Sequence, residues 1–255
     1  MALPRFYCPG PISIDEIVEL PGSAAHHASR VLRLQPGARL ILFNGNGGEF
    51  QGILERIDRN GAAVIVKKYL SIERESPLAI TLAQAACASE KMDWIVQKGV
   101  ELGINRIQIL TTKLSMIKLS GERAERRVRH WQQIAISACE QCGRNRIPQV
   151  PPIMSLSAWC GVQISVRENS ARDAASGLRF VLSPGAKKGL RDFSGSSPIS
   201  SVTLLAGPEG GLTQDEEAAA MVAGFIPLSL GARILRAETA GLAAASAMQA
   251  LWGDY

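Results

Sequence analysis

The chain has 255 residues, of which 46% are hydrophobic and 20% are charged, a composition typical of a globular protein. No apolar run approaches the roughly 18 to 20 residues that span a bilayer. The first residues, MALPRFYCPG, lack the apolar core of a secretory signal. These absences predict a cytoplasmic protein that does not bind a membrane.

The net charge of +5 arises in the first part of the chain. Residues 151–255 hold 8 basic and 9 acidic side chains, so the excess lies within residues 1–150. This asymmetry favours a polyanionic partner that is bound by the front of the chain. An excess of this size is also compatible with a basic enzyme that never binds nucleic acid.

The cysteines and histidines indicate no metal site. Five scattered cysteines, an odd number, favour reduced thiols. Cys139 and Cys142 form a C-x-x-C pair, but no second pair exists and His130 is badly spaced for a zinc finger. His26 and His27 have no acidic or cysteine partner at ligand spacing. We therefore expect no metal and interpret the C-x-x-C pair as two small residues near a helix end.

The first 70 residues are typical of a small β-barrel. Apolar or alternating segments predict three strands, at residues 38–43, 49–57 and 62–66. Asparagine- and glycine-rich turns separate them, at residues 44–48 and 60–61. Because a strand follows residues 44–48, this loop is not a dinucleotide-binding fingerprint. The polar residues 71–77 end in proline and are interpreted as a linker.

From residue 78 onward the pattern changes to alternating strands and helices. Strands are predicted at residues 79–85, 106–110, 178–182, 202–206 and 225–230. Helices are predicted at residues 92–102, 123–142, 213–223 and from about 238 onward. Thr213 and Glu216 have the spacing of a capping box, which marks a helix start. The alternation predicts an α/β fold with a parallel sheet, although residues 161–200 are poorly informative.

Two of these strands end in glycine-rich turns. The sequence GPEGG follows residue 206, and SLG ends at Gly231. Ligands of α/β sheets bind at such strand ends, where glycine lets the backbone approach a ligand closely. One such turn is weak evidence, but two strengthen the prediction of a binding site that holds an anion or an adenine edge.

Arg236 stands out between the second turn and the last helix. Glu238 or Thr239 can cap that helix, whereas Arg236 has no capping role and is the better candidate for function. The chain contains no G-x-S-x-G, H-E-x-x-H or Walker motif, so the sequence does not support a hydrolase of these types or a P-loop nucleoside triphosphatase.

Basic side chains form a further candidate group, because arginine can direct two N–H groups at one phosphate. Lys91 and Lys98 are seven residues apart and so share a helix face. Arg144 and Arg146 follow the predicted end of the long helix. A solvated helix face is an equal alternative for three residues, Arg126, Arg127 and Arg129.

Five separated motifs, taken in order along the chain, resemble the motifs of one protein family. They are ASRVLRLQPGARLILFNG, KMDWIVQKGVELGI, ACEQCGRNRIP, LLAGPEGG and LSLGARILRAETA. The chain resembles the ribosomal RNA small subunit methyltransferase E family. This resemblance implies a PUA-like RNA-binding β-barrel over residues 1–72 and a SPOUT methyltransferase domain with a deep trefoil knot over residues 73–255. It also implies an obligate homodimer.

The resemblance further implies a reaction. S-adenosyl-L-methionine would donate a methyl group to N3 of one uridine in the decoding region of 16S ribosomal RNA, on the small ribosomal subunit. The implied cofactor contacts are Leu205, Ala206, Gly207, Pro208, Glu209, Gly210, Gly211, Leu228, Ser229, Leu230, Gly231, Ile234, Leu235, Arg236, Glu238, Thr239 and Ala240.

The resemblance also leads to expected catalytic and RNA-binding residues. Arg236 would orient the base or stabilise the uracil anion. Glu101 and Glu209 are candidates for the general base, and solvent hydroxide stays open. The expected RNA contacts are Arg5, Arg30, Arg33, Lys91, Lys98, Arg123, Arg144 and Arg146.

Two alternatives stay open at this point. One is a SPOUT methyltransferase that acts on another RNA or on ribose, which the position of the methyl group would reveal. The other is a non-catalytic RNA-binding protein of ribosome assembly, which would not bind the cofactor. The sequence does not say whether free RNA or the assembled subunit is the substrate.

Overall fold

The computed structural model describes residues 3–59, 61–117, 119–169, 177–195 and 199–255. The chain folds into two compact units. The first comprises Met1–Glu75 and Ile136–Ile147, and the second comprises Ser76–Ala135 and Pro148–Tyr255. None of the helices in the described ranges is long and apolar enough to cross a membrane. The domain boundary expected between residues 72 and 73 stays a prediction.

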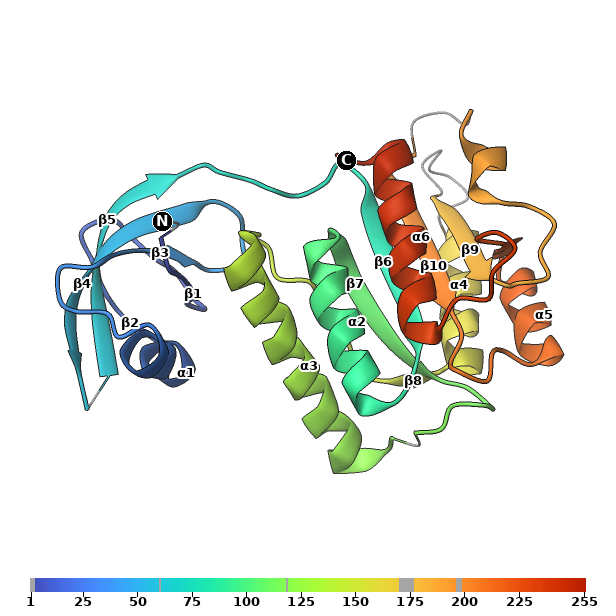
Figure 1. Cartoon of the computed structure of the whole chain (residues 1–255), viewed down its shortest axis with the longest axis horizontal. Coiled ribbons are helices and arrows are strands. Elements are labelled where there is room, and N and C mark those ends of the chain that lie inside the picture. Colours follow the sequence, from blue (N-terminus) through green and yellow to red (C-terminus); the bar gives the residue numbers. More distant parts are fainter. Residues whose placement is uncertain (1–2, 60, 118, 170–176, 196–198) are drawn as a thin grey trace. The chain divides into compact units, whose positions relative to one another are not determined.

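The first unit is built on a five-stranded sheet with the order β1-β3-β4-β5-β2 (Figure 1). Its strands are β1 (Arg5–Tyr7), β2 (Ile17–Glu19), β3 (Arg39–Phe43), β4 (Glu49–Asp58) and β5 (Gly61–Leu70). Neighbours are antiparallel, except that β1 and β3 run parallel. The three predicted strands are confirmed as β3, β4 and β5. The predicted turn before Gly61 joins β4 to β5, although Asn60 itself lies outside the described residues.

A short helical segment packs on this sheet. It consists of α1 (Gly22–His26) and the π-helix η1 (His27–Val31), neither of which the sequence pattern predicted. Three alanines of this segment are buried in the core with side chains from β3, β4 and β5. The small alanine side chain lets the helix backbone approach the sheet closely, and this explains why so short a helix is stable here.

The second unit is built on a six-stranded parallel sheet with the order β11-β9-β10-β6-β7-β8. Its strands are β6 (Ala79–Ala85), β7 (Ile104–Thr111), β8 (Met154–Ser155), β9 (Leu178–Leu182), β10 (Ser201–Ala206) and β11 (Ile226–Leu228). The central strands read as nearly continuous apolar runs because both faces of the sheet are covered by helices. The predicted parallel sheet is therefore confirmed.

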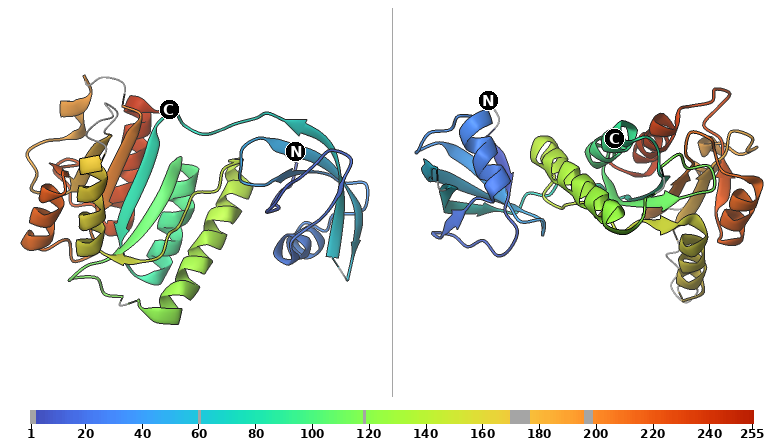
Figure 2. Two further views of the ribbon diagram at one scale, coloured as in Figure 1. Left: turned by 180° about the vertical axis from the view of Figure 1, so that it is seen from behind. Right: turned by 90° about the horizontal axis from the view of Figure 1, so that it is seen from below.

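Helices cover this sheet in two layers. On one face lie α2 (Ser89–Glu101), α3 (Gly121–Cys142) as far as Ala135, and α6 (Ala237–Trp252), and on the other lie α4 (Leu156–Asn169) and α5 (Gln214–Val222) (Figures 1 and 2). A 3-10 turn, η3 (Leu190–Phe193), precedes β10. The predicted capping box is present at the start of α5, where the Thr213 N–H donates to Glu216 at 2.9 Å.

The order of the strands across the sheet differs from their order in the sequence. β10 lies between β9 and β6, and β11 forms the edge beside β9. After β11 the chain returns so that α6 packs on α2, β10 and β6. This arrangement brings the loops after β9, β10 and β11 to one edge of the sheet. The trefoil knot that the resemblance implies in this region stays a prediction.

Candidate cofactor pocket and RNA-binding residues

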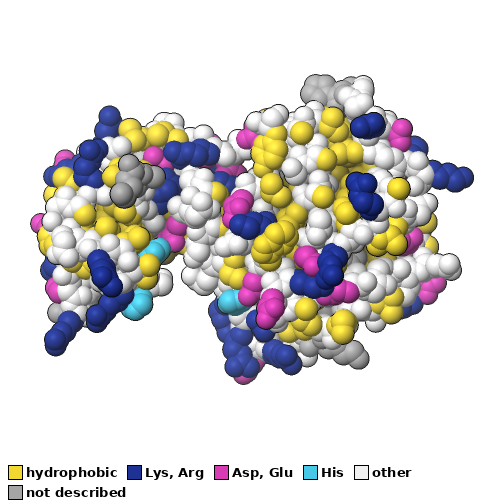
Figure 3. All heavy atoms as spheres, in the orientation of Figure 1, with side chains coloured by type: hydrophobic (Ala, Val, Ile, Leu, Met, Phe, Trp, Pro, Cys, Tyr) yellow, Lys and Arg dark blue, Asp and Glu magenta, His cyan; other side chains and the backbone are white. Residues whose placement is uncertain are grey.

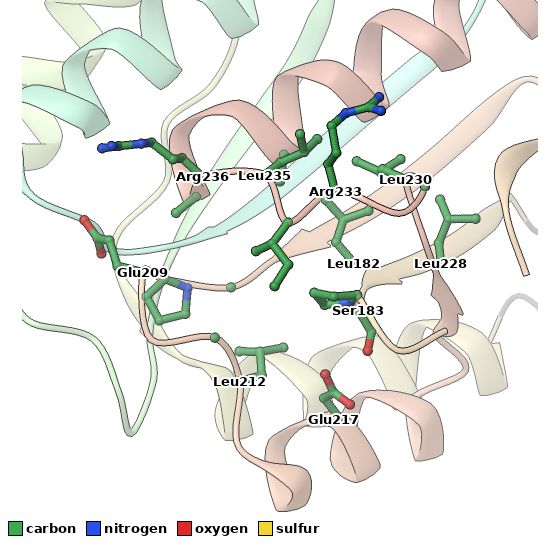
Figure 4. A pocket seen from close by; sticks show the side chains of 18 of the residues that line it. Leu182, Ser183, Glu209, Leu212, Glu217, Leu228, Leu230, Arg233, Leu235 and Arg236 are labelled. Carbon is green, nitrogen blue, oxygen red and sulfur yellow. The ribbon is translucent and has the colours of Figure 1, made fainter. Parts of the chain in front are cut away.

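A pocket of about 510 Å³ lies at the carboxyl ends of β9, β10 and β11 (Figure 4). These strands are neighbours and parallel, so the loops that follow them meet at one edge of the sheet, where α/β folds bind ligands. The volume is within the usual range of roughly 300 to 1,000 Å³ for small-molecule sites. The lining residues are Lys91, Leu182, Ser183, Pro184, Gly207, Pro208, Glu209, Gly211, Leu212, Glu217, Leu228, Leu230, Gly231, Arg233, Ile234, Leu235, Arg236, Ala237 and Ala240.

Glycines shape the loop that follows β10. Gly211 has a φ of +74°, in the left-handed region that L side chains rarely adopt. A Cβ at Gly207 would meet the backbone carbonyl carbon of Gly211 at 3.3 Å. The loop therefore folds back tightly on itself and keeps the floor of the pocket open. Gly210 differs, because a Cβ there would meet Leu114 at 3.2 Å rather than the pocket.

One lysine joins two carboxylates at the rim of the pocket. Lys91 Nζ, on the first turn of α2, lies 3.2 Å from Glu209 Oε1 and 3.2 Å from Glu238 Oε2. The Ala88 N–H also donates to Glu209 Oε1, at 3.2 Å. Burial would raise the pKa of Glu209, but hydrogen bonds from its own backbone N–H, from Ala88 and from Lys91 outweigh it and hold the pKa below its ordinary value. Glu209 is therefore ionised and is a weak base.

Arg236 lies at the same end of the pocket. It occupies the N-cap position of α6, where its carbonyl accepts the N–H of Thr239 and that of Ala240 at 2.9 Å each. The expected capping by Glu238 or Thr239 is wrong, because the helix already begins at Ala237. Figure 4 shows the Arg236 and Glu209 side chains at one end of the pocket, with Arg233 pointing away. Its guanidinium is exposed and makes no ion pair within the described part of the chain.

Glu101 lies elsewhere. It is the last residue of α2, and Lys98 Nζ donates to its two carboxylate oxygens at 2.8 and 3.1 Å. Ten residues separate it from Lys91, which is about 15 Å along a helix axis. Glu101 does not line the pocket, so the structure does not bring together the two residues that were expected to act in catalysis.

Two of the expected RNA contacts are buried in the first unit. Arg5 Nη1 lies 2.6 Å from Glu49 Oε2, and its side chain is only 9% exposed. Arg144 is buried and forms a bidentate pair with Glu75. The Asn145 side chain donates to the carbonyl of Ile72 at 2.8 Å. These contacts attach the segment after α3 to the barrel. We therefore leave Arg5 and Arg144 out of the RNA-binding group.

The other expected RNA contacts differ in their partners. Lys91 and Lys98 are paired with carboxylates, as described above. Arg146 is half exposed and pairs with Glu73 at 2.8 Å. Arg30, Arg33 and Arg123 are exposed and form no ion pair with any described residue, so they remain available to phosphates.

The cysteines form no metal site in the described ranges. No three or more His, Cys, Asp or Glu side chains there are grouped so that they could hold a metal ion. Cys139 is buried and donates to the Arg146 carbonyl at 3.6 Å. Burial raises the pKa of its thiol to about 12, which makes it a poor nucleophile. The C-x-x-C pair therefore ends helix α3 as a structural element.

Comparison with known families identifies the chain. The family model of the RNA methyltransferase domain matches residues 74–249, and that of the RNA methyltransferase PUA domain matches residues 20–67. The chain belongs to the ribosomal RNA small subunit methyltransferase E family. The member from Buchnera aphidicola subsp. Schizaphis graminum is 33% identical over 252 residues, which cover 99% of this chain and 98% of that protein. The member from Bacillus subtilis is 29% identical and covers 90% of this chain.

Two solved structures agree with this family over their whole length. A Legionella pneumophila methyltransferase with bound S-adenosylmethionine has 37% identity and a TM-score of 0.90, with 100% of both chains covered. The ribosomal RNA small subunit methyltransferase E of Neisseria gonorrhoeae, bound to S-adenosyl methionine, has 36% identity, a TM-score of 0.87 and the same coverage. The expected family and its two-part fold are confirmed, apart from the knot.

Most of the family residues that the motifs indicated line the pocket. Those that do so are Gly207, Pro208, Glu209, Gly211, Leu228, Leu230, Gly231, Ile234, Leu235, Arg236 and Ala240. Those that do not are Leu205, Ala206, Gly210, Ser229, Glu238 and Thr239. Leu205 and Ala206 are buried within β10, whereas the Ser229 hydroxyl accepts the Gly231 N–H at 3.3 Å and shapes the loop.

The sequence analysis missed one wall of the pocket. Leu182 ends β9, Ser183 and Pro184 follow it, and all three line the pocket; Figure 4 shows Leu182 and Ser183. Residues 178–182 were predicted as a strand, and Pro184-Gly185 marks its end. The available signal was therefore a third strand end, but nothing local indicates that this strand lies beside β10.

Proposed function

We propose that this protein transfers a methyl group from S-adenosyl-L-methionine to N3 of a uridine in the decoding region of 16S ribosomal RNA, on the small ribosomal subunit. The observation that carries the proposal is the pocket at three adjacent strand ends, in a chain whose relatives at 36–37% identity hold this cofactor. The RNA class follows from the family, whose members are named for methylation of small-subunit ribosomal RNA.

The lining of the pocket fits this cofactor. Its apolar walls, which include Leu182, Leu212 and Leu228, suit an adenine ring and the methylene groups of the methionine part. The carboxylates of Glu209 and Glu217 are acceptors for ribose hydroxyls or for the amino group of the cofactor. When bound, the cofactor supplies an electrophilic methyl group on a positively charged sulfur.

The protein then has two tasks, to orient the uracil and to stabilise the charge that forms when N3–H is lost. Arg236 is an exposed cation at the rim, on the side of Glu209, and its guanidinium suits both tasks. Hydrogen bonds from its own backbone N–H, from Ala88 and from Lys91 keep Glu209 ionised, and Glu101 lies outside the pocket. We therefore assign the proton transfer to hydroxide from solvent, with Arg236 stabilising the anion, rather than to either carboxylate.

The proposal includes a homodimer whose interface involves α2 and α6. The exposed face of α6 carries small residues such as Ala243 and Ala250, and Leu251 is 43% exposed. Trp94 on α2 is 46% exposed, and Figure 3 shows hydrophobic side chains gathered where these two helices lie. Large exposed apolar side chains of this kind mark interfaces between proteins. Light scattering should give twice 27.3 kDa, and a monomer at micromolar concentration would contradict this part.

The decisive experiment combines two measurements. Purified protein and labelled cofactor are incubated with small ribosomal subunits and, separately, with protein-free 16S RNA and transfer RNA. The RNA is then digested, and mass spectrometry locates the methyl group. Methylation of uridine N3 in 16S RNA supports the proposal. A methyl group on ribose or on transfer RNA would favour the alternative methyltransferases, and absence of cofactor binding would favour a non-catalytic RNA-binding protein.

A further inference from the structure

Three arginines form an outward face on the first half of α3. Arg123, Arg126 and Arg127 are spaced i, i+3 and i+4, so their side chains project from neighbouring positions on one side of the helix. Arg123 and Arg126 are exposed and Arg127 is half-buried, whereas Trp131 and Ala135, further along the helix, are buried. Figure 3 shows Lys and Arg side chains gathered where the first turns of α3 lie. We name Arg123, Arg126 and Arg127 the arginine face.

The protein does not neutralise this face. Within the described residues no carboxylate oxygen lies within 4.0 Å of these three guanidinium groups, whereas other basic side chains of α3 do have acidic neighbours. Arg129 Nη1 lies 3.7 Å from Glu125 Oε2, and His130 Nε2 lies 3.0 Å from Asp93 Oδ2. Unlike Arg144 in the first unit, the arginine face therefore has no structural partner.

Folding alone does not favour such a face. Like charges at i, i+3 and i, i+4 destabilise a helix, by roughly 0.2 to 0.5 kcal/mol per pair. Arg123 also lies in the first turn, where the positive end of the helix dipole disfavours a cation. A bound anion would offset these unfavourable terms, and three adjacent cations match a polyanion.

The position of the arginine face indicates which polyanion binds to it. The loop between β7 and α3 carries the chain from the carboxyl edge of the sheet to the arginine face. In this loop the Lys113 N–H donates to Glu216 Oε1 at 2.7 Å, and Leu114 lies against Gly210 of the pocket loop. The arginine face therefore begins at the sheet edge that holds the pocket, within the same unit.

We infer that the arginine face binds the phosphate backbone of the RNA whose base enters the pocket. This inference rests on the proposed function and adds a phosphate-binding surface in the methyltransferase unit, separate from Arg30 and Arg33 in the first unit. Arginine is suited to this role, because its planar group directs two N–H donors at one phosphate. RNA held at this edge would have its target nucleotide beside Arg236.

The test uses the full chain with the triple variant Arg123→Gln, Arg126→Gln and Arg127→Gln. Arg129→Gln is the control, because it also removes an exposed charge from α3. Unlike the three arginines of the face, Arg129 has an acidic neighbour, Glu125. Binding of a fluorescently labelled 16S ribosomal RNA transcript is measured at several salt concentrations. S-adenosylmethionine affinity by calorimetry and the melting temperature are measured in parallel.

The triple variant should bind the transcript about tenfold or more weakly, and the slope of log affinity against log salt should fall by about two to three, as expected for three lost phosphate contacts. Its cofactor affinity should be unchanged, and its melting temperature should equal or exceed that of the wild type because repulsion is relieved. Arg129→Gln should change the slope by less than one.

Unchanged transcript affinity and salt slope in the triple variant would overturn the inference, as would an equal loss in Arg129→Gln. If either of these results is found while the wild type methylates small subunits, the inference about the arginine face is wrong and the proposed function stands. If the wild type neither binds the transcript nor transfers a methyl group to any small-subunit RNA, both the proposed function and the inference fail.

Discussion

In the first unit one carboxylate, Glu49, lies between two arginines, whereas in the second unit one lysine, Lys91, lies between two carboxylates. Glu49 is 3% exposed, and it contacts Arg5 at 2.6 Å and Arg74 at 3.0 Å. The side chain of Lys91 is 28% exposed and lies on the rim of the pocket.

Burial separates the roles of these two clusters. A buried ion pair is costly to break, because the remaining partner is left as an uncompensated charge away from water. A pair at the rim is partly screened and contributes little to stability. The buried cluster therefore holds the segment after α3 to the barrel, while the rim cluster positions the loop after β10 against the first turns of α2 and α6. The predictions below test this difference.

The largest effect is expected in the buried cluster. Glu49→Gln leaves Arg5 without its anion and should lower the free energy of unfolding by about 3 kcal/mol. This value is at the lower end of the range for a broken buried ion pair, because Arg74, the second partner of Glu49, is half exposed. Glu19→Gln is the matched control, since Glu19 pairs with Arg56 on the surface of the same unit. It should cost less than about 1 kcal/mol. Chemical denaturation measures both, and equal losses would contradict the structural role of Glu49.

The next effect concerns catalysis at the rim. Arg236→Ala should lower the rate of methyl transfer about a hundredfold or more, as expected for the loss of one preorganised charge-stabilising group. The fold and cofactor binding should be kept, and Arg236→Lys should restore only part of the rate because a point charge replaces a planar fork. Single-turnover transfer to small ribosomal subunits at saturating cofactor measures the rate. Turnover within a few-fold of wild type would mean that Arg236 is structural.

A smaller effect is expected for the lysine between the two carboxylates. Lys91→Met leaves Glu209 and Glu238 facing each other without a cation, so the loop that carries Glu209 and the first turn of α6, which carries Glu238, should separate. Cofactor affinity should fall by no more than about tenfold, since each of these solvent-screened pairs contributes little. Lys98→Met, on the same helix but paired with Glu101 outside the pocket, should leave affinity unchanged. Calorimetry with S-adenosylmethionine compares them, and equal affinities would refute the positioning role of Lys91.

The smallest effect is a dependence of stability on pH. Burial raises the pKa of Glu49, but Arg5 and Arg74 outweigh it and hold the pKa below its ordinary value of 4.5. Because the folded pKa is lower than the unfolded one, this carboxylate stabilises the fold above pH 4.5, and the contribution is lost as the pH falls through the folded pKa. The stability difference between wild type and Glu49→Gln should therefore shrink under acid. A constant difference between pH 7 and pH 3 would contradict this.

Much of the local structure and the family followed from the sequence by itself. Strand and helix periods, the capping box at Thr213 and the glycine-rich turns are local patterns, and the structure has them where they were expected. The five ordered motifs predicted the family, the barrel and the α/β unit. Eleven of the seventeen expected cofactor contacts line the pocket, because the residues of one turn stay together in any fold.

Only the tertiary structure decided which distant residues meet. The wall at Leu182 depends on sheet order, which places β9 between β10 and β11, and no local pattern encodes that order. Arg144 and Glu75 are 69 residues apart, so the sequence could not show that this arginine is buried and paired while Arg123 is not. Short-range preferences set each element, whereas long-range packing determines the partner of each charge and thus which cations remain available to RNA.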